Sequence, residues 1–319
     1  MDGVVLTASS IFGAKKNMKI DVIIPVYQPD EKLKDLLVML KKQTFPVEHV
    51  LLMNTGEVTF PDEYLQLHPG IQVYRIKKEA FDHGGTRHKG AGYSDAEYLL
   101  YMTQDAVPGD ARLVERLAAS FSDKRVKAAY ARQLPASDCS ELERYTRSFN
   151  YPGESRVKTL EDLKELGIKT FFCSNVCAMY EKKTYEELGG FVRHTIFNED
   201  MIYAGNLVKA GYGVAYVADA LVIHSHNYSG RQQFHRNFDL AVSQADHPEV
   251  FGGIRSESEG IRMVKQAAGH CMRIGKPWLI FSLVYQSGCK YIGYKLGRSY
   301  KRLPRWLVFW CTMNRGYWK

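Results

Sequence analysis

Hydrophobic residues in this chain fall into short uninterrupted runs separated by segments with helical periodicity. The runs that we expect to form buried strands span residues 21–27, 49–54, 71–76, 98–103, 127–132, 171–180 and 213–223. One helix is expected after the first strand, because Leu33, Leu36, Leu37 and Leu40 are spaced i, i+3, i+4 and i+7. Further helices are expected over residues 85–95, 111–121, 184–188 and 200–210. This alternation is typical of an α/β protein with a doubly wound, mostly parallel sheet. Such sheets bind ligands at the carboxyl ends of their strands.

The chain is expected to have three parts. Beyond Tyr228 the pattern is helical to the end, so we predict an N-terminal extension (1–18), an α/β domain (19–230) and a C-terminal helical, basic region (231–319). Residues 260–319 contain twelve Lys or Arg and no Asp or Glu, whereas the first 259 residues carry a net charge of about −4. A chain that is basic at one end only is typical of a catalytic body with a cationic attachment surface.

The C-terminal region also has an amphipathic pattern. At about 100° per residue, five basic residues share one arc: Lys290, Lys295, Arg298, Lys301 and Arg302. The apolar residues Ile292, Leu296 and Leu303 lie opposite, and four tryptophans suit a membrane interface: Trp278, Trp306, Trp310 and Trp318. This pattern predicts a membrane-associating region that binds an anionic membrane surface. Two alternatives are that the apolar face packs on the catalytic domain, or that the aromatic and basic residues bind RNA.

The six cysteines show no paired framework, so we expect buried free thiols in a reducing compartment. The longest apolar stretch, Trp278–Tyr285, is too short to span a bilayer. With the basic C-terminal region, these features predict a cytoplasmic protein that is peripheral on the inner face of the cell membrane.

Two motifs at strand ends are candidates for metal binding. Asp105 follows the strand expected over 98–103, where a carboxylate can hold Mg²⁺ or Mn²⁺ against a diphosphate. His224 and His226 follow the last strand and, being two residues apart, point to the same side. Imidazole is a common ligand of Mn²⁺ sites. The alternatives are that Asp105 caps the next helix and that the histidines are structural.

Two adjacent acids, Glu199 and Asp200, open the helix expected over 200–210. Group transfer to a hydroxyl needs a positioned general base, which such a pair can supply. The alternative is helix capping, since helix N-termini favour carboxylates.

Paired glycines stand between His83 and Arg87 in the segment Phe81–Arg87 (FDHGGTR). Backbone amides at such a turn can cradle a phosphate, and Arg87 can hold it by a bidentate contact. The segment lacks GxGxxG spacing and does not follow the first strand, which disfavours dinucleotide binding. The alternative is a tight turn with a salt-bridged arginine.

Five segments carry a family resemblance through their order and spacing. They are IIPVY (Ile23–Tyr27), FDHGGTR (Phe81–Arg87), MTQDA (Met102–Ala106), FNED (Phe197–Asp200) and HSHNYS (His224–Ser229). Together they resemble the family 2 glycosyltransferases of the GT-A fold, and within them the rhamnosyltransferase group. The resemblance covers residues 19–229 and implies that the α/β domain is a GT-A catalytic domain.

The resemblance implies roles for the matching residues. Asp200 corresponds to the catalytic base, and Asp105 to the last acid of the DxD metal motif. Because Thr103 occupies the first position of that motif, His224 or His226 is needed as an additional metal ligand. The donor would be bound by Pro25, Tyr27, Asn54, His83, Gly84, Arg87 and Gln104, and the acceptor region would include Glu199 and Asn175, the latter in a strand.

The implied activity is an inverting, metal-dependent glycosyl transfer. Mg²⁺ or Mn²⁺ and nearby donors would stabilise the leaving nucleoside diphosphate, while Asp200 takes the proton of the acceptor hydroxyl. The resemblance favours dTDP-β-L-rhamnose as donor and a glycan or lipid-linked glycan of the cell surface as acceptor. Alternatives are a UDP-sugar donor, or a non-catalytic membrane- or nucleic-acid-binding protein. Since the last leaves the acidic and histidine motifs unexplained, no nucleic-acid partner is expected.

Overall fold

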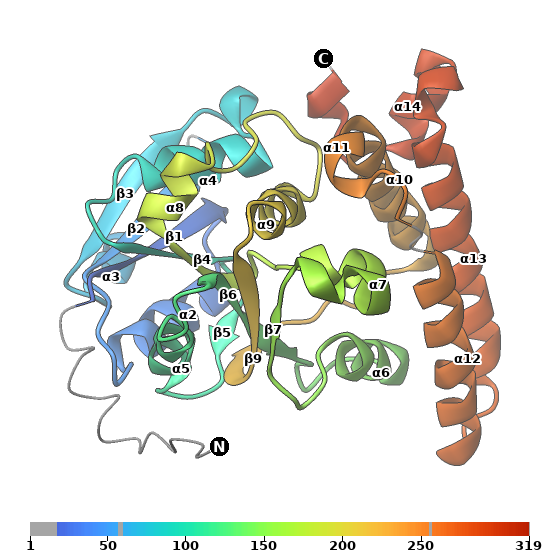
Figure 1. The fold of residues 1–319 in the computed structure, drawn as a ribbon, viewed down its shortest axis with the longest axis horizontal. Helices are drawn as coiled ribbons and strands as arrows, with labels where there is room; N and C mark the ends of the chain where they lie inside the picture. Colours follow the sequence, from blue (N-terminus) through green and yellow to red (C-terminus); the bar gives the residue numbers. More distant parts are fainter. Residues whose placement is uncertain (1–17, 57–59, 255–256, 319) are drawn as a thin grey trace.

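A mixed β-sheet forms the centre of the protein (Figure 1). The computed structural model describes residues 18–56, 60–254 and 257–318, so the expected N-terminal extension lies outside them except for Met18. Within these ranges nine strands are ordered β3-β2-β1-β4-β8-β6-β9-β5, with β7 also paired to β9. Their bounds are Ile20–Tyr27 (β1), His49–Thr55 (β2), Ile71–Ile76 (β3), Tyr98–Met102 (β4), Val107–Pro108 (β5), Val126–Leu134 (β6), Arg156–Lys158 (β7), Cys177–Glu181 (β8) and Gly213–Ile223 (β9).

The main strands point in one direction, which confirms the α/β fold class. β1, β2, β3 and β4 pair in parallel, and so do β6 and β9. β8 lies between β4 and β6 and is antiparallel to both. β4 and β6, and the two parallel groups to which they belong, therefore point in the same direction. The carboxyl ends of β1, β2, β4, β6 and β9 therefore share one edge of the sheet, where the predicted site residues follow them.

Successive strand residues enter two cores, one on each face of the sheet. In β1, Val22 and Ile24 belong to the first core and Ile23 to the second, because strand side chains alternate. The first face is covered by α2 (Glu31–Lys41) and α5 (Leu113–Ser120), and the second by α4 (His83–Ala91), α8 (Lys182–Glu187) and α9 (Glu199–Lys209) (Figure 1). Shorter helices are α3 (Asp62–Leu65), α6 (Glu141–Asn150), α7 (Leu163–Leu166) and α11 (Pro248–Phe251), and 3-10 turns span Lys78–Ala80, Leu160–Asp162, Gly167–Phe171, Tyr300–Arg302 and Arg315–Trp318.

The strand expected over 171–180 is shorter than predicted. Gly167–Phe171 forms a 3-10 helix, and only Cys177–Glu181 joins the sheet. Asn175 therefore lies in the loop before β8, so its placement in a strand was wrong. The run resembled a strand because Phe171 and Cys173 are buried in the second core without pairing to a neighbouring strand.

The chain after β9 is helical, as expected. α10 (Gly230–Asp246) packs lengthwise against α13 (Leu279–Arg298), which has α12 (Glu257–Arg273) beside it and is followed by α14 (Arg305–Cys311) (Figure 1). The two helix backbones touch, since a Cβ at Gly293 would lie 2.2 Å from the carbonyl oxygen of Phe234. None of the helices in the described ranges is long and apolar enough to cross a membrane.

The helical projection predicted the faces of α13 incorrectly. Lys290 points toward the catalytic domain, where it lines a cavity, and Ile292 is 55% exposed. Trp318, expected at an interface, packs with α10 and α14 instead. The exposed face of α13 carries a stripe of apolar side chains at helical spacing: Phe281, Val284, Tyr285, Tyr291 and Ile292.

Candidate active site

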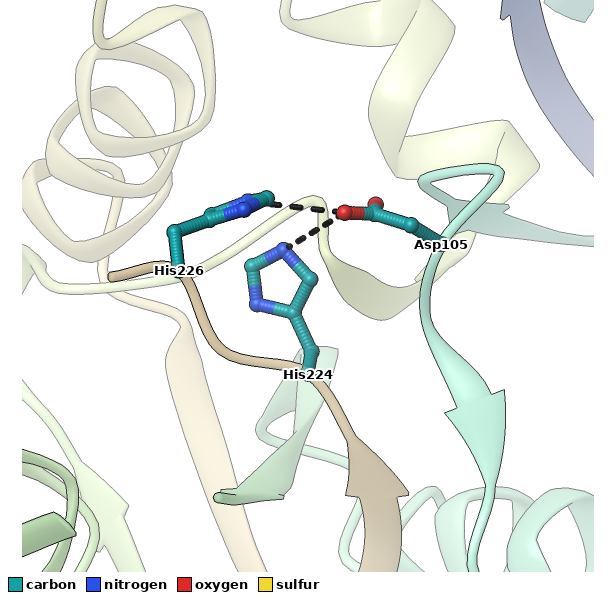
Figure 2. Close-up of side chains that lie close together, drawn as sticks. All are labelled: Asp105, His224 and His226. Carbon is teal, nitrogen blue, oxygen red and sulfur yellow. Dashed lines mark ion pairs between the residues drawn. The ribbon is translucent and has the colours of Figure 1, made fainter. Parts of the chain in front are cut away.

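Asp105, His224 and His226 meet where β4 and β9 end (Figure 2). Oδ2 of Asp105 lies 3.6 Å from Nε2 of His224 and 3.4 Å from Nε2 of His226. The three ligand atoms lie within 4.8 Å of one another. One carboxylate oxygen and two imidazole nitrogens form a mixed donor set that suits a divalent transition metal. The structure thus joins the three residues that the sequence motifs singled out.

Gln133 orients His224. Its Oε1 lies 3.1 Å from Nδ1 of His224 and also accepts a hydrogen bond from Arg147. Because an amide oxygen only accepts, the proton of His224 is on Nδ1, and the Nε2 lone pair faces Asp105. Burial is the main reason why the pKa of His224 is lowered, so the ring is neutral and able to bind a metal. Sequence analysis missed Gln133, although a polar residue near the end of an apolar strand was a signal.

The two adjacent acids are held at the start of α9. Asn198 has a left-handed backbone (φ 63°), and its side chain donates to the carbonyl of Leu240 (3.1 Å). Asp200 accepts hydrogen bonds from the backbone N–H of Asn175 (3.0 Å) and of Met201 (2.8 Å). Its carboxylate therefore has a fixed orientation.

Asn175 anchors both acids and also lines the cavity. Besides its N–H bond to Asp200, its Nδ2 donates to Oε1 of Glu199 (3.2 Å), and its Oδ1 accepts from the hydroxyl of Tyr180 (2.9 Å). Glu199 also forms an ion pair with Arg87 (3.2 Å). The side chains of Asn175 and Glu199, both expected in the acceptor region, are thus occupied by protein partners.

The environments of Glu199 and Asp200 separate their pKa values. Burial opposes ionisation of both acids. The charge of Arg87, followed by that of His83, nevertheless lowers the pKa of Glu199. Burial and then the charge of Glu199 raise the pKa of Asp200. Of the two acids, Asp200 is therefore the one suited to accept a proton near neutral pH.

One cavity of about 420 Å³ contains both the metal triad and the acids. It lies between the carboxyl edge of the sheet and helices α6, α10 and α13. Eight of the thirteen predicted residues line it: His83, Arg87, Asp105, Asn175, Glu199, Asp200, His224 and His226. A carboxylate suited to accept a proton and a candidate cation site that face one space can together serve group transfer to a hydroxyl.

Four other predicted residues lie near the ends of β1, β2 and β4, outside this cavity. Tyr27 is 47% exposed, and its backbone N–H donates to Oε1 of Gln104 (2.8 Å). Gln104 precedes Asp105 and so connects this surface to the metal triad. Pro25 is half-buried in β1, and Asn54 is buried in β2.

The segment Phe81–Arg87 leads into α4. Its glycines lie within the first turn of α4, where the Asp82 carboxylate caps the helix by accepting from the N–H of Gly85 (2.6 Å). Gly84 permits close packing, since a Cβ there would lie 1.9 Å from the carbonyl oxygen of Val192. Arg87 already pairs with Glu199, so the salt-bridged alternative is the one observed.

Further cavity residues, not found from the sequence, come from helices far from the sheet. Glu143 and Arg147 belong to α6, Arg236 to α10 and Lys290 to α13. The basic C-terminal region was visible in the sequence. The direction of these side chains depends on how the helices pack, which no local motif encodes.

A second cluster, Asp21, Glu48 and His49, lies at the opposite edge of the sheet. Asp21 is buried and accepts hydrogen bonds from Oγ of Ser94 (2.6 Å) and from the N–H of His49 (3.0 Å). Its oxygens are satisfied by the protein, so this cluster has a structural explanation.

Comparisons with known proteins show the family of this chain. Residues 21–189 match the model of the family described as Glycosyl transferase family 2. The chain is 37% identical over 308 residues to the O-antigen chain rhamnosyltransferase RfbN of Salmonella typhimurium, covering 94% of this chain and 96% of that protein. It is 40% identical over 247 residues to the O-antigen chain rhamnosyltransferase WbaN of Salmonella anatum, covering 76% and 78%.

A solved structure shares the fold. The mannosyltransferase PcManGT from Pyrobaculum calidifontis, in complex with GDP-Man and Mn²⁺, superposes with a TM-score of 0.55 over 95% of this chain and 86% of that one. At 13% identity, the likeness concerns the fold alone.

Proposed function

This chain belongs to glycosyl transferase family 2 and is a glycosyltransferase, and we propose that it transfers L-rhamnose from dTDP-β-L-rhamnose to a hydroxyl of a cell-surface polysaccharide precursor. Two relatives named O-antigen chain rhamnosyltransferases, at 37% and 40% identity, support this assignment. The observation that carries the mechanism is the shared cavity, which Asp200 lines together with Asp105, His224 and His226.

Asp200 acts as the general base in this proposal. Its carboxylate takes the proton of the acceptor hydroxyl as the hydroxyl oxygen bonds to the anomeric carbon. The bond from that carbon to the diphosphate oxygen breaks, and its electron pair remains on the diphosphate. Attack opposite the leaving group inverts the anomeric configuration. The raised pKa of Asp200 supports this role, because it gives the carboxylate proton affinity near neutral pH.

The residues present fit the divalent cation that the fold family implies. Asp105, His224 and His226 would hold it, and the Gln133 contact leaves Nε2 of His224 available. Two imidazoles beside one carboxylate favour Mn²⁺ over Mg²⁺, which prefers oxygen ligands. When bound, such a cation supplies positive charge that stabilises the leaving diphosphate.

The nucleotide would lie along Pro25, Tyr27, Asn54 and Gln104. Pro25, Tyr27 and Asn54 lie near the carboxyl ends of β1 and β2, and Tyr27 bonds to Gln104, the neighbour of Asp105, so a nucleotide there would extend its diphosphate toward the metal triad. The acceptor then enters from the helical side of the cavity, since Asp200 and Asn175 lie there with α6 and α10.

We further propose that the outer surface of α13 and α14 binds an anionic membrane that carries a lipid-linked acceptor. Phe281 is 82% and Trp306 is 71% exposed, and Val284, Tyr285, Tyr291, Ile292 and Trp310 are more than half exposed. Exposed Lys295 and Arg298 lie on the same helix. A second copy of the chain fits this surface less well. Residues 260–319 contain no Asp or Glu, so the basic residues of two copies would face and repel one another.

A donor screen tests the proposed function. The protein would be incubated with Mn²⁺ and single nucleotide sugars, and thermal stabilisation and nucleotide release would be measured. A donor at a hundred times its Kd stabilises the folded state by about 2.7 kcal/mol, so dTDP-β-L-rhamnose should raise the Tm clearly. Release of UDP from a UDP-sugar, with no dTDP released from dTDP-β-L-rhamnose, would instead establish the alternative donor class.

A further inference from the structure

A second cavity, of about 500 Å³, lies next to the active-site cavity. Asn150 and Phe172 line both cavities, so the two spaces meet at these residues. The lining of the second cavity comes from β6, β7 and β9 and from α6, α7 and α12 (Figure 1). Its volume falls within the range of small-molecule sites. Neither the candidate base nor the metal triad lines it, so the proposed mechanism leaves this space unused.

Aromatic rings form the inner wall of the second cavity. Tyr130 and Tyr216 are buried, and their ring centroids lie 5.2 Å apart. The ring of Phe172 meets that of Tyr130 edge-on at 5.6 Å, and Phe149 of α6 adds a fourth, half-buried ring. The hydroxyl of Tyr216 donates to the carbonyl of Pro152 (2.6 Å), which fixes this wall to the loop after α6.

The mouth of the second cavity is polar. Four exposed side chains that can form hydrogen bonds line it: Asn150, Glu154, Ser155 and Gln266. An aromatic wall with polar groups at its edge suits a sugar. The faces of aromatic rings are electron-rich and attract the C–H groups of a sugar ring, while the hydroxyls of the sugar can bond to the polar edge.

The charged side chains around the second cavity are paired with one another. Lys169 and Arg262 both form ion pairs with Glu259, at 2.5 Å and 2.6 Å. Arg156 pairs with Glu165 (2.8 Å). These pairs cancel much of the charge at this site, which favours a neutral ligand over an anion.

Lys158, at the inner wall, also contributes little charge. Its side chain is buried, and its Nζ donates to the carbonyl oxygens of Lys169 (3.1 Å) and Phe172. Burial is the main reason why the pKa of Lys158 is lowered to about 7, so much of this amine is uncharged at neutral pH. The two hydrogen bonds hold the backbone of Phe172 at the junction of the cavities.

The segment 172–175 connects the second cavity to the candidate base. Phe172 lines both cavities, and three residues later the backbone N–H of Asn175 donates to Asp200 (3.0 Å). Because consecutive Cα atoms are about 3.8 Å apart, the Cα atoms of Phe172 and Asn175 are separated by at most about 11 Å. A short oligosaccharide can span such a distance.

We propose that the second cavity binds neutral sugar units of the acceptor glycan, next to the unit whose hydroxyl faces Asp200. The inference rests on the proposed function, which takes the acceptor to be a glycan that enters on the side of α6. It adds a binding site for the part of the acceptor that does not react. Binding there would position the reacting unit and make recognition depend on the length of the glycan.

Oligosaccharide binding without any donor tests this site. An array of neutral oligosaccharides, from single sugars to pentasaccharides, would be probed with the full-length protein, and the retained glycans would be titrated by calorimetry. Phe149→Ala removes one ring of the cavity, Phe149→Tyr keeps it, and Gln266→Trp places a bulky side chain at the mouth. Lys265→Trp is the matched control, because Lys265 is the exposed neighbour of Gln266 on α12 and does not line the cavity.

The wild type should bind longer glycans more tightly than single sugars. Phe149→Ala and Gln266→Trp should each lower the affinity for the longer glycans about tenfold or more, since each removes or blocks an aromatic contact. Phe149→Tyr and Lys265→Trp should bind as the wild type does, and thermal unfolding shows whether each variant is folded. Retention of no neutral oligosaccharide by the wild type, or equal affinities in the wild type, Phe149→Ala and Gln266→Trp, would overturn the proposal.

Kinetics with the retained glycans separate this inference from the proposed function. Phe149→Ala and Gln266→Trp should raise the KM of the longer acceptors, with kcat and the KM of the donor unchanged, because the second cavity contacts neither the base nor the nucleotide residues. Transfer with an unchanged acceptor KM in both variants would overturn the inference alone. Glycan binding that the two variants lose, without rhamnose transfer to any acceptor, would refute the proposed function and leave the second cavity as a glycan site.

Discussion

Arg87 and Glu199 form a buried ion pair beside the candidate base, with 3.2 Å between Nη1 and Oε1 and side chains that are 7% and 9% exposed. The pair keeps Glu199 charged, and that charge, after burial, raises the pKa of its neighbour Asp200. Since a protonated Asp200 cannot accept a proton, turnover should fall as the pH decreases through its raised pKa, well above the ordinary value of about 4.

Glu199→Gln should shift the acidic limb of the pH–rate profile to lower pH. The substitution removes the negative charge that raises the pKa of Asp200, so Asp200 stays ionised in more acidic solution. It also leaves Arg87 buried without a charged partner, which should cost about 3–5 kcal/mol of stability by thermal or denaturant unfolding. Glu187→Gln, at an exposed position, is the control. An acidic limb that does not move would show that Glu199 does not tune the base.

Asp200→Asn should lower turnover by roughly 10²–10⁴-fold with near-normal donor affinity. The amide keeps the shape of the side chain but does not take up a proton. Steady-state kinetics and donor titration measure the two effects separately, with Asp219→Asn at an exposed position as the control. Turnover near that of the wild type would remove Asp200 from the proposed mechanism.

Gln133→Met should weaken Mn²⁺ binding by about 10–100-fold, because it removes the acceptor that orients His224. Asp105→Ala should abolish Mn²⁺ binding, and EDTA should abolish the activity of the wild type. Calorimetric Mn²⁺ titration is the measurement, and Asp95→Ala, an exposed acid, is the control. Full activity in EDTA would mean that Arg236, Lys290 and other cations stabilise the leaving group without a metal.

Phe281→Ser combined with Trp306→Ser should weaken binding to anionic vesicles roughly tenfold or more, since each substitution removes a large exposed apolar side chain. Binding of the wild type should also decrease with salt. Vesicle flotation would measure both effects, and Leu65→Ser, 41% exposed on the catalytic domain, is the control. Equal binding to neutral and anionic vesicles, or none to either, would refute the membrane surface.

Gly293→Ala should destabilise the protein by about 1–3 kcal/mol, because its Cβ would lie 2.2 Å from the carbonyl oxygen of Phe234 and force α13 away from α10. Gly288→Ala on the same helix has no atom within 4 Å of the new Cβ and should be neutral or slightly stabilising. Thermal unfolding of both variants measures this difference. Equal Tm values would contradict the close helix contact.

The sequence by itself determined the sheet and the residues at its carboxyl edge. Apolar runs located β1, β2, β4 and β9 because a buried strand must be apolar on both faces. Parallel strands share one edge, so Asp105 and His224, which follow strands far apart in the chain, could be assigned to one site, and the family resemblance added Asp200 to it. The family resemblance rests on these same local segments.

The tertiary structure decided which charges are neutralised and which face the cavity. Arg87 was expected on a phosphate, but folding pairs it with Glu199, and Lys290 was expected at a membrane, but folding turns it inward. Helical periodicity specifies the angle between side chains of α13, and it leaves open which side meets the protein. That choice follows from Gly293 and Gly297, whose missing side chains let α13 approach α10 and so place Lys290 in the site.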